Sequence, residues 1–436
     1  MFAQMLHRLF CAAFGVLACV WSAAAQPDLR GHGGPVRAIA ISPDGARAIS
    51  GSFDSSAIVW SLADAKALAI LRFHDGAINA VLALPQGYVT AGEDGRIAIW
   101  AAGSAAAPEK VIDAHKGPIA GLALSHDRTR IASASWDGTI ALVEIASGKL
   151  LQRFTGHTGN VNAVAFSPDD TLLASAGYDA TLRLWRSNGG GEIATLTLPA
   201  ALNAIAYLPN GEIAAGGADG NIFIADKQGK LLATIDAGEI PAIALASSPD
   251  GARLAAASPR GSVTLVDIAA RRKLFTLTGP GLPVWSVAFS PDGRLLLTGG
   301  SDRLVRRWDA GSGDHLGAVA APPDKDDYGP FAKMPGAEVF KACSVCHTLT
   351  PDGGSRAGPT LYGVFGRKAG SVAGYAYSEA FQKLDLVWTA ETISKLFEIG
   401  PQSYTPGTKM PEQKVGNDAE RAALIEFLKA ATQPRP

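Results

Sequence analysis

The sequence contains one cluster of residues whose types and spacing indicate a specific chemistry, the run Cys343-Ser344-Val345-Cys346-His347. This is a C-x-x-C-H pattern, which is the attachment sequence of a c-type haem. Two thiols at this spacing can add to the two vinyl groups of one haem. The adjacent histidine can then bind the iron as the proximal ligand. The pattern therefore predicts one covalently attached haem c per chain, held by Cys343, Cys346 and His347.

The two cysteines of this pattern have two other interpretations, a zinc site and a redox dithiol. A structural zinc site needs four ligands. Beyond Cys11 and Cys19 near the N-terminus, the chain has only Cys343 and Cys346. A thioredoxin-type dithiol needs a βαβ context, which the surrounding sequence does not provide. Haem attachment is therefore favoured, and no disulfide is expected in the mature chain.

Residues 1–25 have the pattern of a secretory signal peptide. Its parts are the positive Arg8, the apolar run from Leu9 to Trp21 and the small-residue cleavage site Ala23-Ala24-Ala25. Two alternatives stay open: an uncleaved anchor, although the run is short for a spanning helix, or lipidation of Cys19. The haem motif also favours export to the periplasm, because in bacteria the covalent attachment of haem is a periplasmic process. Membrane association is expected only under one of the two alternatives.

Length and composition are those of a soluble globular protein with two or three domains. The chain has 436 residues, of which 47% are hydrophobic and 18% charged, and a formal net charge of −1. Such a balanced charge does not favour binding to nucleic acid or to an anionic membrane surface. We therefore expect no nucleic-acid partner.

Residues 27–320 contain an internal repeat that occurs seven times. Each copy has an alternating apolar run, a turn such as Ser42-Pro43-Asp44-Gly45, a run of small residues, and a second alternating run. The position that ends each copy recurs every 40 to 43 residues, which is the period of a four-stranded propeller blade. These positions are Trp60, Trp100, Val143, Trp185, Ala225, Val266 and Trp308. Because one blade cannot bury both of its faces, the repeat predicts an all-β ring of seven blades.

This stretch resembles the WD40 propellers, in which a His, a Ser or Thr, an Asp and a Trp form a hydrogen-bonded network within each blade. The first four repeats offer His32, Ser50, Asp54 and Trp60; His74, Thr90, Asp94 and Trp100; His115, Ser133, Asp137 and Val143; and His157, Ser175, Asp179 and Trp185. The last three repeats lack the His, and the sixth has Arg260 where the Asp belongs. The fifth and sixth blades therefore depart furthest from the family pattern.

The histidines of these repeats are expected to be structural. Each lies at the same place in its own repeat, so they are spread around the ring and do not form a metal site. Buried polar groups of this kind are normally hydrogen-bonded. Two segments are candidates for the strand that closes the ring, Pro27–Gly31 and Asp314–Ala320.

Residues 331–436 have the size of a single small haem domain, and they follow a linker of prolines and charges at 321–330. Gly336 to Phe340 are predicted to open a helix that runs into the haem motif. Asn417 or Asp418 is predicted to cap a closing helix. The segment between the two helices carries Gly and Pro throughout, so we expect the haem to organise much of this core.

The iron needs a sixth ligand or an open position. Beyond the leader the chain has only two methionines, Met334 and Met410. Met334 precedes the haem motif, whereas Met410 lies in the turn-rich segment 406–411, from which a loop can present its thioether to the far face of the haem. Because Met/His pairs are usual in electron carriers, Met410 is the predicted sixth ligand.

Residues 358–370 and the run Thr408-Lys409-Met410 resemble the mitochondrial and bacterial class I cytochromes c. The resemblance covers nearly all of 336–431 and implies an all-α domain with His347 and Met410 as axial ligands. It also implies that the carbonyl of Pro359 accepts a hydrogen bond from the ring of His347.

The same resemblance assigns further residues. Arg367, Tyr377 and Trp388 match residues that contact a haem propionate in the family; the alternative is a surface charge and two core aromatics. The residues that match the family's helix crossing are Gly336, Phe340, Leu424 and Phe427. Leu396 stands where the family often has Tyr, so a hydrogen bond towards Met410 is not expected.

Charge in this region departs from many mitochondrial relatives, which carry a ring of lysines around the haem edge. From residue 326 onward, 12 lysines and arginines are balanced by 12 aspartates and glutamates. A strongly basic docking face is therefore not expected, although Lys368, Lys409 and Lys414 can form a small local patch.

The favoured function is one-electron transfer through a His/Met-ligated haem, with the propeller as a docking scaffold for an oxidoreductase or oxidase. The partner is expected at the haem edge or on a propeller face. One alternative is a periplasmic oxidoreductase with an active site on the propeller and the haem as electron exit. Another is a haem redox sensor. No ligand cluster or second cofactor motif in 27–320 supports an active site, so we favour an electron-transfer protein over an enzyme.

Overall fold

The structure of the protein is a computed structural model. It describes residues 27–238, 241–279, 282–316, 328–344, 346–350, 358–373, 375, 377, 379–406, 408, 410 and 414–433. The predicted leader, residues 1–25, and residues 321–327 of the predicted linker lie outside the described residues. None of the described helices has both the length and the apolar content needed to cross a membrane.

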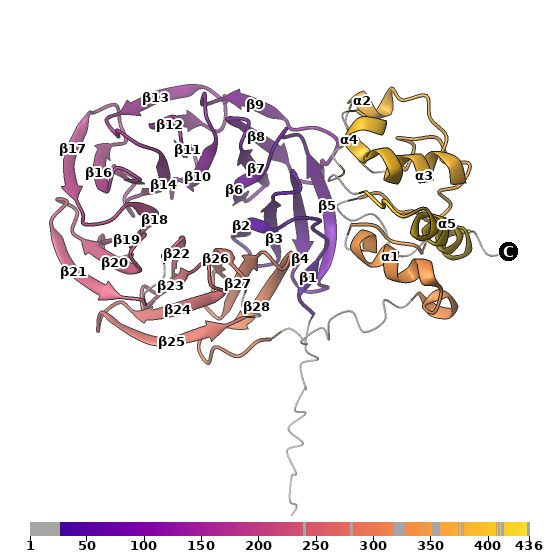
Figure 1. Cartoon of the computed structure of the whole chain (residues 1–436). Helices are drawn as coiled ribbons and strands as arrows, with labels where there is room; N and C mark the ends of the chain where they lie inside the picture. Colours follow the sequence, from indigo (N-terminus) through magenta and orange to yellow (C-terminus); the bar gives the residue numbers. More distant parts are fainter. Residues whose placement is uncertain are drawn as a thin grey trace, which may run out of the picture.

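Seven four-stranded antiparallel sheets form a ring, and a small helical region follows it (Figure 1). The strands of the first four blades are β2 (Val36–Ile41), β3 (Arg47–Ser52), β4 (Ser56–Ser61), β5 (Lys66–Arg72); β6 (Ile78–Leu84), β7 (Gly87–Gly92), β8 (Arg96–Ala101), β9 (Lys110–Asp113); β10 (Ile119–Leu124), β11 (Arg130–Ser135), β12 (Thr139–Glu144), β13 (Leu150–Thr155); and β14 (Val161–Phe166), β15 (Leu172–Gly177), β16 (Thr181–Arg186), β17 (Glu192–Thr197). Those of the last three are β18 (Leu202–Tyr207), β19 (Ile213–Gly217), β20 (Asn221–Ala225), β21 (Leu231–Asp236); β22 (Ala244–Ser247), β23 (Arg253–Ala257), β24 (Ser262–Asp267), β25 (Arg272–Thr278); and β26 (Val284–Phe289), β27 (Leu295–Gly300), β28 (Leu304–Asp309), β1 (Leu29–Arg30). The predicted propeller of seven blades is confirmed.

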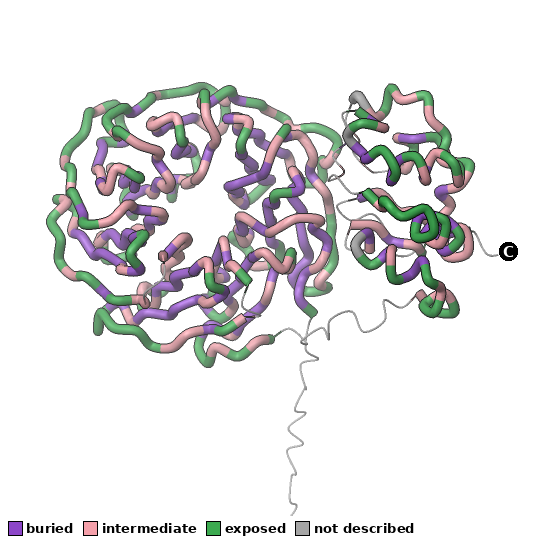
Figure 2. Tube along the Cα trace, in the orientation of Figure 1, coloured by how far each residue is buried: buried purple, intermediate pink, exposed green. Residues whose placement is uncertain are grey.

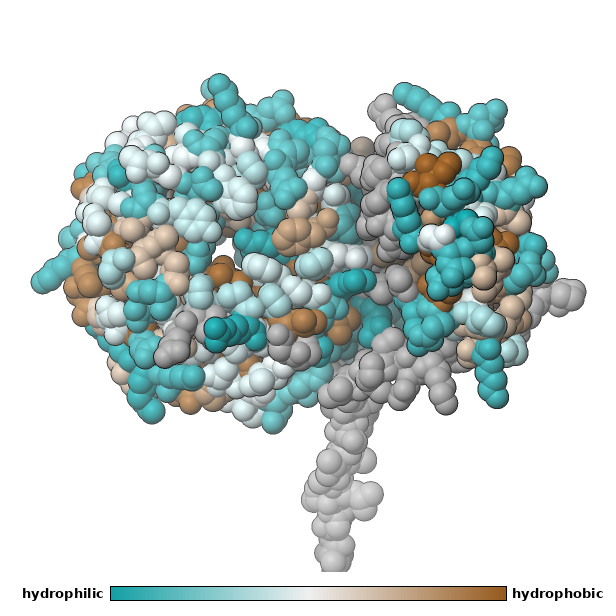
Figure 3. Space-filling view, viewed as in Figure 1, coloured by the Kyte–Doolittle hydropathy of each residue, from teal (hydrophilic) through white to brown (hydrophobic). Residues whose placement is uncertain are grey.

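Burial is greatest in the two middle strands of each blade. In the first blade all residues of β4 are buried, whereas most of the outer strand β5 is exposed or half-buried. The innermost strands are also partly exposed, as in β10 and β22. Figure 2 shows exposed residues on the outermost strands around the ring. The middle strands are packed between neighbouring blades, which explains why their sequences are apolar and rich in small residues. The face of the ring in Figure 3 is mainly hydrophilic and is hollowed at its centre.

The N-terminal segment closes the ring. Strand β1 pairs antiparallel with β28 through Leu29↔Val305 and Arg30↔Leu304, so the first residues of the domain complete the last blade. The other end of the domain reinforces this closure. Nε2 of His315 lies 3.0 Å from Oδ1 of Asp28, and the His315 ring packs on Trp308 with centroids 4.9 Å apart.

The predicted polar networks are present in the first four blades. In blade four the donor and acceptor of each hydrogen bond can be assigned. Nε1 of Trp185 donates to Oγ of Ser175 at 2.9 Å. That hydroxyl lies 2.8 Å from Nε2 of His157, whose Nδ1 lies 2.9 Å from Asp179. Because the Ser175 oxygen accepts from Trp185, its own hydrogen can donate to His157, which leaves a neutral imidazole with its proton on Nδ1. Burial lowers the pKa of His157, although Asp179 opposes this shift.

The helical region packs around a crossing of its first and last helices. Its elements are η1 (Gly329–Phe331), α1 (Pro335–Ser344), α2 (Glu379–Gln382), α3 (Ala390–Ile399), α4 (Pro401–Tyr404) and α5 (Asp418–Thr432). A Cβ on Gly336 of α1 would overlap the carbonyl oxygen of Ala423 in α5, so only glycine permits this approach. The rings of Phe340 and Phe427 pack 5.3 Å apart beside it. These contacts agree with the helix crossing that the resemblance implies.

Helix α3 was not predicted from the sequence. Its N-terminus is fixed by a capping box, in which the Thr389 side chain accepts from the backbone N–H of Thr392 and the Thr392 side chain accepts from that of Thr389. Ile393, Leu396 and Phe397 repeat at helical spacing and are buried. The signal was therefore present in the sequence, but the many glycines and prolines around it obscured it. The closing helix begins as predicted, since the Asn417 side chain accepts from two backbone N–H groups at its start.

Candidate haem site

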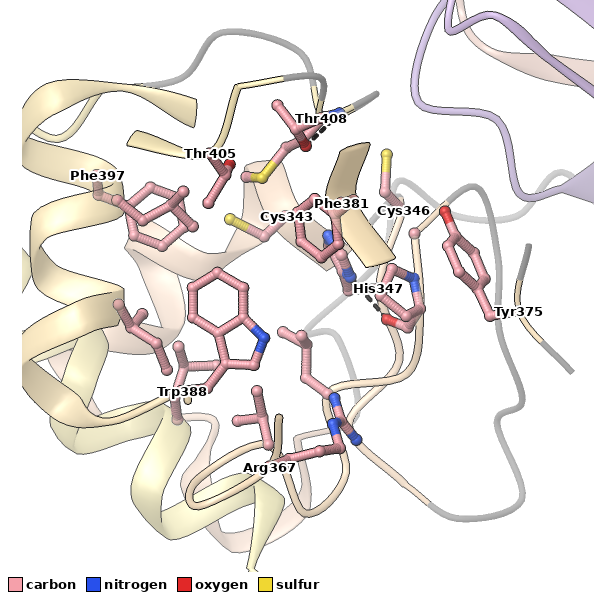
Figure 4. Close-up of a pocket in the computed structure, with 18 of the residues that line it drawn as sticks. Cys343, Cys346, His347, Arg367, Tyr375, Phe381, Trp388, Phe397, Thr405 and Thr408 are labelled. Carbon is pink, nitrogen blue, oxygen red and sulfur yellow. Dashed lines mark hydrogen bonds between the residues drawn. The ribbon is translucent and has the colours of Figure 1, made fainter. Parts of the chain in front are cut away.

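The helical region surrounds a cavity with an empty volume of about 1290 Å³, including its open mouth. All eight residues predicted for the site lie here or touch its lining (Figure 4). They are Cys343, Cys346, His347, Pro359, Arg367, Tyr377, Trp388 and Met410.

Helix α1 positions the attachment motif at its C-terminal end. The backbone N–H groups of Cys346 and His347 both donate to the carbonyl of Cys343, at 3.1 and 3.0 Å. This turn carries the two thiols and the imidazole to one side of the cavity. Cys343 and Cys346 form no disulfide in the described part of the chain. Burial raises the pKa of the Cys343 thiol to about 12, so before haem attachment this group is protonated at neutral pH.

The orientation of the His347 ring is fixed from two sides. Its Nδ1 lies 2.7 Å from the carbonyl oxygen of Pro359, which accepts the hydrogen bond. A Cβ on Gly358 would overlap the imidazole ring, so the absence of a side chain there gives the ring its place. Because Nδ1 is engaged by a carbonyl, Nε2 is the nitrogen that can bind iron.

Met410 lines the cavity from the segment between α4 and α5, as predicted for a loop residue. Its backbone N–H donates to Oγ1 of Thr408 at 3.1 Å, and Thr408 in turn donates its backbone N–H to the carbonyl of Thr405 at 3.0 Å. Both threonines are buried. These local bonds hold the turn that carries the thioether.

Arg367, Tyr377 and Trp388, the residues assigned to a propionate, all line the cavity. Arg367 also forms hydrogen bonds with backbone groups. The guanidinium of Arg367 donates to the carbonyls of Thr360 and Tyr362, at 2.7 and 2.8 Å. Burial lowers the pKa of Arg367, and the nearby Tyr377 opposes this shift. The backbone N–H of Trp388 donates to the carbonyl of Arg367 at 2.9 Å. Arg367 therefore organises the loop after the haem motif, in addition to any contact with the cofactor.

Apolar side chains from three helices form most of the remaining wall. They are Phe340 of α1, Ile393, Leu396 and Phe397 of α3, and Leu424 and Leu428 of α5. Leu396 could be singled out from the sequence, whereas Ile393 and Phe397 had no predicted role because α3 was not predicted.

Aromatic residues between the predicted positions also belong to the lining. Tyr377 stacks on Phe381 with centroids 5.3 Å apart, and Tyr375 meets Tyr377 edge-on at 4.7 Å. Sequence reasoning missed Tyr375 and Phe381. Two propeller residues, Asp54 and Arg72, line the same cavity, and no local pattern in the sequence connects them to it.

The residues present fit a covalently held haem. The space has mainly apolar walls, both thiols and the imidazole come from one turn, and Gly358 leaves a cradle that a Cβ would fill. An imidazole and a thioether are the donor set of electron-carrying cytochromes c. Elsewhere in the described residues, no group of three or more His, Cys, Asp or Glu side chains is arranged to hold a metal ion.

Comparisons with known families divide the chain in the same way. A family model described as the IFT122 first beta-propeller matches residues 84–321, and the WD domain, G-beta repeat, matches residues 24–61. The cytochrome c family model matches residues 334–432.

Three cytochromes c are similar to the C-terminal part of this chain. The cytochrome c of Gibberella zeae is 41% identical over 99 residues, which are 22% of this chain and 92% of that protein. The cytochromes c of Cochliobolus lunatus and Arabidopsis thaliana are each 42% identical over 99 residues, 22% of this chain and 91% and 88% of theirs.

Proposed function

Because the chain belongs to the WD40 β-propeller and cytochrome c families, we propose that it is an exported one-electron carrier whose haem is ligated by His347 and Met410. The family implies covalently bound haem c and haem-based electron transfer. The observation that supports the ligand pair is that an oriented imidazole and a loop thioether line one apolar cavity. We propose one haem per chain, since the sequence has a single C-x-x-C-H motif.

The bound haem supplies reversible exchange of one electron between its ferric and ferrous states. The protein's part is to hold that group with little rearrangement. Pro359 fixes the tautomer of His347, and the buried threonines hold the Met410 turn. Apolar walls from α1, α3 and α5 exclude water from the iron, which with a thioether ligand favours a high reduction potential. With His347 and Met410 both bound to the iron, no coordination position would remain for a substrate.

Redox titration of the purified full-length protein tests this function. We expect a single one-electron transition and one haem per chain by pyridine-adduct spectroscopy. More than one transition, or loss of haem on denaturation in acid, would contradict a single covalently bound carrier group.

We propose export to the periplasm, supported by the signal-like residues 1–25 and by the haem motif itself. Fractionation of the source cells together with mass measurement of the mature N-terminus tests this. A chain that begins at Gln26 supports cleavage after Ala25. A lipidated Cys19 or an intact leader would instead place the protein on the membrane.

We propose that the propeller docks a redox partner through one face of the ring. Phe53, Trp136 and Tyr178 directly precede the network aspartates of blades one, three and four, so they lie on the same face, and each is at least 44% exposed. Exposed large aromatic residues are enriched at protein interfaces. The double variant Trp136→Ser/Tyr178→Ser should slow electron exchange with a membrane oxidase fraction while leaving the potential unchanged. An unchanged rate of electron exchange would show that the partner does not dock on this face.

A further inference from the structure

The first blade of the propeller forms part of the wall of the haem cavity. Figure 1 shows the helical region beside β5, the outer strand of that blade. Asp54 and Arg72 line the cavity together with residues of the helical region, including Cys346 and Tyr375. The cavity is therefore composite, and its propeller side must face whatever group the cavity holds.

Arg72, at the end of β5, has a buried donor for which the described residues provide no acceptor. Its guanidinium carbon lies 5.3 Å from the ring centroid of Tyr375 in the helical region. Its Nε is buried, and it has no hydrogen-bond partner within the part of the chain that the structure describes. An arginine stays charged in proteins, and a buried donor without an acceptor is unfavourable. Arg72 can therefore donate a hydrogen bond to an anionic group held in this cavity.

Asp54 is close enough to influence Arg72, but its hydrogen-bonding capacity is used inside its own blade. Oδ2 accepts from Nδ1 of His32 at 3.1 Å and from the backbone N–H of Gly33 at 2.7 Å. Oδ1 accepts from the backbone N–H and the hydroxyl of Ser56. An ionised carboxylate has about four acceptor sites, so these contacts fill them. Burial alone would raise the pKa of Asp54, but His32 and Arg72 hold it well below its usual range.

A second contact brings the same blade against the attachment motif. A Cβ on Gly33 would overlap Sγ of Cys346, the atom that bonds to a haem vinyl group. In Figure 4 the Cys346 sulfur points away from the side of the cavity where Cys343 lies. A haem bonded at Cys346 would therefore have its attached edge next to the turn that contains Gly33.

We propose that Arg72 binds an anionic haem propionate and that the turn at Gly33 covers the haem edge attached at Cys346. The inference rests on the proposed function, because it requires a covalently bound haem in this cavity. The propeller is then a component of the redox centre as well as a docking scaffold. A positive charge beside the haem stabilises the reduced state, whose net charge is lower by one unit, so Arg72 raises the reduction potential.

The test is the reduction potential of full-length Arg72→Gln, with Lys66→Gln as the matched control. Lys66 begins the same strand and is exposed. At about 3.3 Å per residue it lies about 20 Å from Arg72, beyond the screening length of about 8–10 Å. We expect Arg72→Gln to shift the redox equilibrium with a reference couple about tenfold toward oxidised protein. For one electron this corresponds to a fall in reduction potential of about 59 mV. Lys66→Gln should leave the potential unchanged, and Arg72→Lys should restore most of the wild-type value.

Gly33→Ala provides an independent test that does not alter charge, with the exposed Gly191→Ala as its control. A Cβ on Gly191 meets no atom within 4 Å. The added Cβ of Gly33→Ala must separate the turn from Cys346. We therefore expect this variant to be reduced faster by a soluble chemical reductant. Gly191→Ala should be reduced at the wild-type rate.

The inference is wrong if Arg72→Gln and Lys66→Gln have the same potential while the wild-type protein keeps a low-spin, His/Met-type spectrum. It is also wrong if Gly33→Ala reduces no faster than Gly191→Ala. A wild-type protein with high-spin haem would instead overturn the proposed ligation, whatever the potentials of the variants. The two failures are therefore distinguishable.

Discussion

The Nδ1 atom of His347 lies 2.7 Å from the carbonyl oxygen of Pro359, and the preceding Gly358 has no room for a side chain against the same ring. One residue thus orients the imidazole and its neighbour provides the space. Gly358→Ala should push the ring from its place and weaken its bond to iron. We expect a larger high-spin fraction in the absorption spectrum, and a loss of stability of about 1–3 kcal/mol from overpacking.

Gly416→Ala is the control for this variant, since a Cβ there meets no atom within 4 Å. It should retain the wild-type spectrum and unfolding midpoint. If both alanine variants behave as the wild type does, the proposed role of Gly358 in positioning His347 is incorrect.

The crossing of α1 and α5 gives a prediction that concerns stability rather than ligation. A Cβ on Gly336 would overlap the carbonyl of Ala423, and backbone cannot move as easily as a flexible side chain. Gly336→Ala should therefore destabilise the helical region by about 1–3 kcal/mol. Denaturant unfolding followed at the haem absorbance measures this. Unfolding of the propeller, followed by far-ultraviolet circular dichroism, should change little, and an equal loss in both signals would contradict a local effect.

The buried histidines of blades three and four predict a pH dependence of the propeller. Burial lowers the pKa values of His115 and His157 in the folded state. Below the unfolded value of about 6.5, the unfolded chain binds protons that the folded chain does not. The stability that these two histidines allow is therefore fully retained above this pH, and it falls as the pH drops below it.

Urea unfolding at pH 7.5 and 5.5 tests this dependence. We expect a lower midpoint at pH 5.5. We also expect the midpoints of His157→Gln at the two pH values to differ less than those of the wild type. The altered hydrogen bonds should lower its free energy of unfolding at pH 7.5 by about 1 kcal/mol. A wild-type midpoint that rises on acidification would reverse the sign of the argument.

Met410 is predicted to be the sixth ligand, and its removal should open the iron. Met410→Ala should convert the oxidised haem to a high-spin or water-ligated spectrum and lower the reduction potential, because a thioether favours the ferrous state. Met334→Ala is the matched control, since Met334 packs against the helical core and does not line the cavity. A spectrum and potential unchanged in Met410→Ala would show that the sixth ligand is another residue.

Much of the architecture could be predicted because it is repeated or local. Seven copies of one pattern predicted seven blades, and the networks around His32, His74, His115 and His157 follow from their identical places in the repeat. The attachment motif and the cap at Asn417 are equally local signals. In each case the residues that interact are either close in sequence or related by a fixed period.

The parts that could not be predicted depend on contacts between distant segments. The pairing of β1 with β28 joins the two ends of the propeller, and the sequence left two segments open for that place. Arg72 and Asp54 reach the haem cavity only because the helical region lies against the first blade, more than 250 residues later in the chain. No periodicity marks such a contact, and an arginine on an outer strand has the appearance of an ordinary surface charge.

The visible spectrum of the purified full-length protein, oxidised, reduced, and reduced under carbon monoxide, tests the central claim most directly. If His347 and Met410 both bind the iron, the reduced spectrum will be low-spin and will not change when carbon monoxide is added. A high-spin spectrum, or rapid formation of a carbon monoxide adduct, would show an open coordination position and contradict the account of a closed one-electron carrier.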